Sequence, residues 1–159
     1  MKPISLSDLK KELQAVAPNE LIDLCINLAR YKKDNKEYLG YLLFDSANKP
    51  AFIQEVKHEI EEHINELKSQ PNLYYVKKSL RKLLRLLSKY SKFLNDKALS
   101  ADMLIYFCGQ LKQSDIAYNK SPLLVNLYKQ QLKKIYALIS SLHKDLQQDY
   151  LNDLEKISA

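Results

Sequence analysis

Glycine is scarce in this sequence, which has only Gly40 and Gly109 among its 159 residues. Tight hairpin turns and phosphate-binding loops both require glycine, because this residue alone permits positive φ values and close backbone approach without steric cost. Two isolated glycines cannot form a G-x-G-x-x-G or Walker A motif. This scarcity therefore excludes nucleotide binding through such loops and disfavours a strand-rich fold.

Long apolar runs and cysteines are also few. The longest apolar run covers residues 103–108, far fewer than the roughly 20 residues that span a bilayer. The amino terminus has no long apolar signal core. Cys25 and Cys108 both lie in apolar helical segments, so we expect two buried free thiols in a reducing compartment. These features predict a soluble, cytoplasmic protein with no membrane partner.

The composition is that of a globular chain, with 46% hydrophobic and 28% charged residues. A length of 159 residues predicts a single domain over 1–159, since domains usually hold roughly 100–150 residues. A core of this size folds without disulfides or metal, so no cofactor is expected. The net charge of +6 is compatible with an anionic partner such as nucleic acid or an acidic protein.

Apolar residues recur with helical spacing along the whole chain, and typical helix-starting residues stand where each pattern begins. The helix near residue 103 is apolar on almost all sides and is expected to be central. This pattern predicts an all-α fold of seven or eight helices, either an irregular bundle or a short solenoid of helical hairpins. The expected helix starts are Ser7, Pro18, Asp34 (with Glu37 in a capping box), Pro50, Leu73, Ser100 and Ser121, and a last helix carries Leu146 to Ile157. The helix that starts at Pro50 is expected to bury Ile53, Val56, Ile60, Ile64 and Leu67. Residues 45–50 are expected to form a loop.

One internal similarity links the helices expected near residues 18–31 and 100–112. When residues 21–28 are aligned with residues 104–111, Leu, Ile, Cys and Leu coincide at the first, second, fifth and eighth places. Chance alignment of leucine-rich helices explains this, and so does a duplicated helical unit stacked as in a solenoid.

No catalytic residue and no metal ligand is predicted. His58 and His63 are five residues apart, which places them about 140° apart around a helix and too far apart for one ion. Cysteines among apolar neighbours are not activated nucleophiles, and no G-x-S-x-G motif exists. The carboxylates around the histidines are instead expected to form an exposed acidic stripe: Glu55, Glu59, Glu62 and Glu66.

The most informative feature is a cationic face on the helix expected from Leu73 to Leu94. Six basic residues fall within an arc of about 100°, and leucines occupy the opposite side. Like charges at these spacings repel by a few tenths of a kcal/mol per pair, so solvent, the acidic stripe or an external anion must offset them. We name this the basic face and take it as the candidate site for an anionic partner, with Tyr74 able to stack on a base: Lys78, Arg81, Lys82, Arg85, Lys89 and Lys92.

An apolar flank lies between the basic face and the leucines of the same helix and consists of Tyr75, Leu86 and Phe93. We expect it to pack under a neighbouring helix. If these residues are exposed, they form a contact surface for a partner or for self-association.

The first third of the chain contains three short motifs in residues 5–13 (SLSDLKKEL), 20–24 (ELIDL) and 36–39 (KEYL). In these motifs it resembles a family of uncharacterised small bacterial all-helical proteins. The resemblance implies a bacterial origin and a helical fold, and it assigns no activity and no site residue.

These observations predict a non-catalytic helical interaction module that presents helix faces to another macromolecule. A nucleic-acid-binding protein that uses the basic face from Lys78 to Lys92 is the alternative. A third hypothesis is an enzyme whose site combines residues distant in sequence, and no residue pattern in the sequence supports it.

Overall fold

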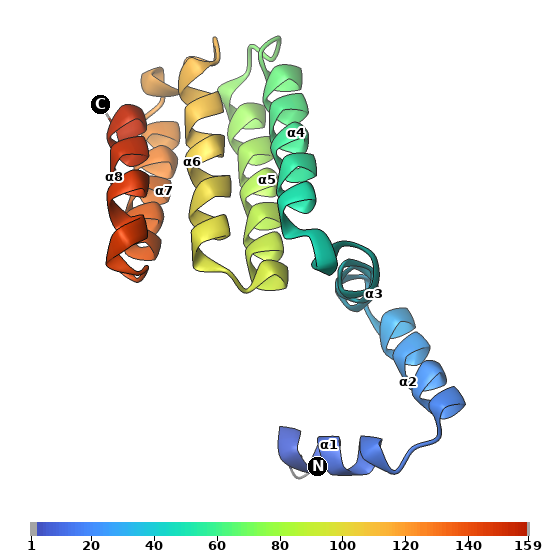
Figure 1. Ribbon diagram of the computed structural model, residues 1–159. Helices are drawn as coiled ribbons and strands as arrows, with labels where there is room; N and C mark the ends of the chain where they lie inside the picture. The colour runs from blue at the N-terminus through green and yellow to red at the C-terminus, as the bar shows by residue number, and fades with distance from the viewer. Residues whose placement is uncertain (1–2, 159) are drawn as a thin grey trace. The chain divides into compact units, whose positions relative to one another are not determined.

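A computed structural model describes residues 3–158, and all regular secondary structure within that range is helical (Figure 1). This confirms the prediction of an all-α fold. One domain over 1–159 is expected from the chain length, and the contacts within the chain form two compact units, residues 1–47 and 48–159. Each unit is described by itself.

Unit 1 (residues 1–47) consists of short helices. Pro18 occupies the first position of its helix as predicted, while residues 45–48, expected in a loop, continue the chain as helical turns. The helices are α1 (Leu6–Gln14), α2 (Pro18–Tyr31), α3 (Lys33–Gly40) and the π-helical turn η1 (Tyr41–Asp45), followed by the 3-10 turn η2 (Ser46–Asn48).

Two predicted helix caps in unit 1 are wrong. Ser5, not Ser7, caps α1: its Oγ accepts a hydrogen bond from the backbone N–H of Asp8 at 3.1 Å. Asp34 lies in the first turn of α3, because the helix begins one residue earlier, after Lys32. Each correction moves a helix start by one or two residues and leaves the helix itself in place.

Unit 1 buries few side chains. Tyr41 is buried, and no other described residue of this unit reaches the same burial. Cys25 is exposed, so the expectation that both cysteines are buried is wrong for this one. Of the 18 large hydrophobic residues exposed in the described chain, 13 belong to unit 1. Helices this short are marginal without tertiary packing, so unit 1 carries apolar surface that its own fold does not cover.

Unit 2 (residues 48–159) holds the main core. The five predicted core positions of α4 (Ile53, Val56, Ile60, Ile64 and Leu67) are all buried, and α5 spans the predicted range. The helices are α4 (Lys49–Leu67), α5 (Leu73–Leu94), α6 (Lys97–Gln113), the 3-10 turn η3 (Tyr118–Lys120), α7 (Pro122–Ser140) and α8 (Lys144–Ser158).

Helix α6 begins earlier than predicted. Asp96 is its cap and accepts a hydrogen bond from the backbone N–H of Leu99 at 3.1 Å. Ser100, the expected cap, lies buried one turn inside the helix and donates its hydroxyl to the carbonyl of Asp96 at 2.6 Å. The two aligned segments, residues 21–28 and 104–111, have different environments: Cys108 on α6 is fully buried, whereas Cys25 on α2 is exposed.

The helices of unit 2 form two layers around α6. Helix α6 contacts α4, α5, α7 and α8, and its Met103 and Phe107 are fully buried, which confirms its central place. Successive helices alternate between a layer of α4, α6 and α8 and a layer of α5 and α7 (Figure 1). This alternation is the arrangement of stacked helical hairpins. It places α5 and α7 in one layer, although 27 residues separate them along the chain.

Candidate interaction surface

The basic face lies on the exposed side of α5, opposite the buried leucines of the same helix. Its residues Lys78, Arg81, Lys82, Arg85 and Lys92 are exposed, and Lys89 is half-buried. Tyr74 is 68% exposed at the start of the helix. The amphipathic pattern therefore places this face at the surface, because Val76, Leu80, Leu83, Leu87 and Leu94 take the core side.

The acidic stripe of α4 forms no ion pair with five residues of the basic face in the part of the chain that the structure describes. Where α4 and α5 meet, His63 Nε2 hydrogen-bonds to Ser79 Oγ at 2.7 Å, and the Tyr90 hydroxyl donates to Glu59 Oε2 at 3.1 Å. Within residues 3–158, no ion pair joins Lys78, Arg81, Lys82, Arg85 or Lys92 to a carboxylate. The repulsion along this face is therefore left to solvent, salt or an external anion.

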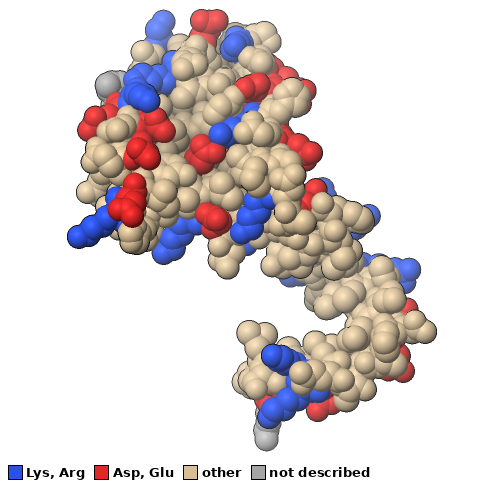
Figure 2. All heavy atoms as spheres, in the orientation of Figure 1, with Lys and Arg blue, Asp and Glu red and all other residues tan. Residues whose placement is uncertain are grey.

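The charges of unit 2 are segregated between its two layers. Helices α5 and α7 carry ten Lys and Arg residues and no Asp or Glu, whereas α4, α6 and α8 carry ten Asp and Glu against six Lys. The α4–α6–α8 face shows both signs interspersed (Figure 2). The net charge of +6 belongs wholly to unit 2, because unit 1 has seven basic and seven acidic residues. The charged residues of the α5–α7 layer are thus all basic, and we call this layer the cationic layer.

A groove separates α5 from α7 within the cationic layer. It has a volume of about 470 Å³, and its floor includes Leu84 and Leu87 of α5, Leu104 of α6 and Leu138 of α7. An adjoining hollow continues it along α5 and brings Arg81 and Arg85 to the edge, with Lys134 of α7 lining both parts. The groove therefore combines an apolar floor with basic rims.

Gln131 of α7 is the polar residue at the bottom of the groove. Its side chain is only 4% exposed and lines both parts of the groove. Its Nε2 donates to the carbonyl of Leu127 at 3.4 Å, and within the described chain its Oε1 accepts no hydrogen bond. Oε1 is not among the fully buried polar atoms that lack a partner, so solvent reaches it in the free protein and a donor of a bound ligand would take the place of that water.

Sequence reasoning identified the α5 part of this surface and missed the α7 part. Lys134, Gln131 and Leu138 were not singled out, because α7 looks like an ordinary amphipathic helix. One signal was available: residues 116–144 contain no Asp or Glu, as is also true of residues 67–95. These two stretches without acidic residues include α5 and α7, so they are the sequence feature that indicates the cationic layer.

The apolar flank of α5 has a mixed environment. Phe93 and Leu86 are half-buried, and the Phe93 ring lies 6.3 Å from the Tyr90 ring, which in turn contacts Phe52 of α4 at 5.3 Å. Tyr75 is 54% exposed and stacks edge-on with Tyr74. The flank thus lies beside α4 at the Phe93 end of α5 and is open to solvent at the Tyr75 end.

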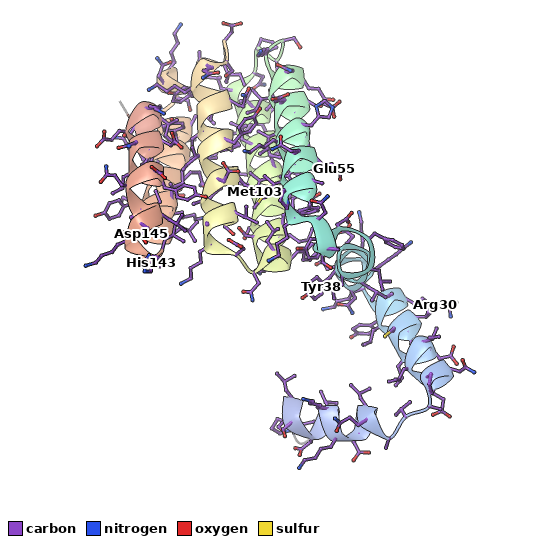
Figure 3. The ribbon with its side chains drawn as sticks, in the orientation of Figure 1. Arg30, Tyr38, Glu55, Met103, His143 and Asp145 are labelled. Atoms are coloured by element: carbon purple, nitrogen blue, oxygen red, sulfur yellow. The ribbon has the colours of Figure 1, made fainter. Side chains whose placement is uncertain are left out.

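The histidines take part in local contacts. Exposed His58 lies 3.3 Å from Glu62 on the next turn of α4. His143 lies beside Asp145 at the start of α8, 3.2 Å from its carboxylate (Figure 3). In the part of the chain that the structure describes, no three His, Cys, Asp or Glu side chains form a group that could hold a metal ion.

Burial changes the acidity of two side chains near the core. Burial raises the pKa of the Cys108 thiol to about 12, so this thiol is protonated at neutral pH. Burial, together with the hydrogen bond to Glu61, raises the pKa of Tyr106 to about 12. Both groups are therefore neutral at physiological pH.

None of the described helices has the length and apolar character needed to cross a bilayer. Comparisons with protein-family models, with curated proteins and with solved structures found no match to this chain.

Proposed function

We propose that the chain is a non-catalytic helical interaction module that binds an acidic protein surface through the cationic layer. The observation that carries this proposal is the segregation of ten basic residues on α5 and α7, with no acidic residue on either helix. Surfaces that mix both signs are the usual solution for solubility, whereas a large field of one sign steers a partner of opposite sign. The uncovered apolar surface of unit 1 also supports an interaction role.

Binding of nucleic acid is the second candidate. The basic residues of the same two helices would neutralise phosphates, and exposed Tyr74 at the end of the basic face could stack on a base. An acidic protein accounts in addition for the apolar groove between the two basic helices, because aliphatic side chains fit its leucine floor, whereas bases stack on aromatic rings and none of the residues that line the groove is aromatic.

The test compares two probes by fluorescence anisotropy with the full chain: a polyglutamate peptide and a single-stranded RNA of about the same charge. We expect the peptide to bind, with an affinity that falls as salt rises, because exposed charges are screened. Substituting glutamate for Arg81, Lys82 and Arg85 together should abolish binding. A matched variant with glutamate at Lys68, Lys120 and Lys144 changes the net charge equally but lies outside the cationic layer, so it should retain most of the affinity.

If both triple variants lose binding equally, net charge alone attracts the probe and the cationic layer is not a site. If RNA binds and the peptide does not, the nucleic-acid function replaces the proposed one. Absence of binding to both probes at low salt overturns both candidates.

A further inference from the structure

The groove between α5 and α7 has an open apolar floor. Leu84, Leu104 and Leu138 are only half-buried by the fold, and Leu87 lies fully buried beneath them. The two helices flank this floor in one layer, so a further helix placed above it would contact both. The groove thus has the shape of a site where one more helix would pack against α5 and α7.

The rims of the groove have the same sign on both sides. Arg81 and Arg85 are exposed on the α5 rim, and Lys134 is exposed on the α7 rim. Lys97, the first residue of α6, lies at one end. A ligand that fills the groove must therefore carry negative charge along both of its edges and apolar groups between them.

We propose that this groove binds an amphipathic α-helix of a partner protein, whose apolar stripe lies on the leucine floor and whose acidic residues face Arg81, Arg85 and Lys134. This inference rests on the proposed binding of an acidic protein and names the element that is bound. Helix-in-groove recognition uses apolar anchors on one helix face. A polar donor among those anchors would hydrogen-bond to Oε1 of Gln131 at the bottom of the groove in place of water.

The test uses two synthetic peptides of about 18 residues, which form about five helical turns. Both contain the same leucines and glutamates: in the first the leucines form one stripe between two rows of glutamate, and in the second they are distributed around the helix. We expect the first peptide to bind the full chain at least about tenfold more tightly than the second, because only the first presents its leucines on one face.

Two lysines of α7 provide a matched pair of variants. Lys134 lines the groove, whereas Lys129 is an exposed lysine five residues earlier, about 140° away around the helix. Lys134→Glu should weaken the striped peptide about three- to tenfold, since it reverses a charge at the contact. Lys129→Glu makes the same change in net charge and should leave the affinity within about twofold, because the charge lies farther from the peptide.

A second pair tests occupancy of the groove itself. Ala137 is exposed and lines the groove, so Ala137→Trp fills it and should weaken the striped peptide by about tenfold or more. Ser140→Trp adds the same ring to an exposed position of α7 outside the groove lining and should have little effect. Circular dichroism of each variant shows that the helices are retained, and the lysine pair decides the question if Ala137→Trp does not fold.

Equal binding of the two peptides, equal weakening by the two lysine variants, or unchanged binding to Ala137→Trp overturns the groove as the site. In those cases binding of the acidic peptides still supports the cationic layer as an interaction surface. Failure of both peptides to bind overturns the groove and the proposed function together.

Discussion

Arg85 has three like-charged neighbours at helical spacing on α5, as many as Arg81 and more than any other described residue of the cationic layer. Its like-charged neighbours on α5 are Arg81 and Lys82 on the preceding turn and Lys89 on the next. Each such pair costs about 0.2–0.5 kcal/mol, so the three together cost about 0.6–1.5 kcal/mol at low salt. The Nε–H of Arg85 donates to the Arg81 carbonyl at 3.4 Å, which is long and contributes little. We therefore expect Arg85→Gln to raise the free energy of unfolding by about 0.5–1.5 kcal/mol.

The assay is urea denaturation followed by helical circular dichroism, at about 0.02 M and about 0.5 M sodium chloride. The gain should appear at low salt and largely disappear at high salt, because screening removes the repulsion. Lys129→Gln is the matched control: Lys133 is its one like-charged neighbour at helical spacing on α7, so it should gain about a third as much. No gain at low salt, or an equal gain at both salts, would refute the view that this face is held under repulsion.

The remaining predictions concern the two cysteines and two hydrogen bonds that hold α6 and α8. In the folded protein at mildly alkaline pH, a thiol reagent should modify Cys25 and leave Cys108 unreacted until denaturant is added, because Cys25 is exposed and burial raises the pKa of Cys108 to about 12; equal reaction rates would contradict this. Tyr128→Phe should lower the free energy of unfolding by about 1–2 kcal/mol and speed amide exchange in α8, since the hydroxyl donates to the Ile157 carbonyl at 2.6 Å; unchanged exchange would show that this bond does not hold α8. Asp96→Ala should lower the free energy of unfolding by about 1 kcal/mol through loss of the α6 cap, and Asp96→Asn should restore most of it, as urea titration can measure.

Local sequence patterns predicted the helices of unit 2 well. The apolar spacing of residues 53–67 gave all five buried positions of α4, and the range of α5 was predicted without error. Both results depend on interactions between residues three or four apart and on caps within one turn, which are properties of the local sequence. The start of α6 was wrong for a related reason, because a serine at a cap and a serine that bonds back to the preceding turn are not distinguished by local sequence.

Burial in unit 1 could not be predicted in the same way. The apolar pattern around Cys25 resembles that around Cys108, yet one thiol is exposed and the other is fully buried. The difference lies in the neighbours: α6 is surrounded by four helices of unit 2, whereas the helices of unit 1 are few and short. An amphipathic pattern indicates that a helix has a face to bury and does not indicate what covers it.

Only one part of the cationic layer, the basic face of α5, can be predicted from the sequence. The basic face was found because its six residues lie on one helix, whereas the groove depends on α7 lying in the same layer as α5, which only the tertiary fold determines. The same fold forms an opposite-charge pair elsewhere, between Lys57 and Asp102 at 2.8 Å across α4 and α6. Similar pairs on α5 and α7 would relieve their repulsion and stabilise the free protein. Within residues 3–158, Arg81, Arg85 and Lys134 form no such pair, which is a cost to stability that an acidic ligand in the groove would offset.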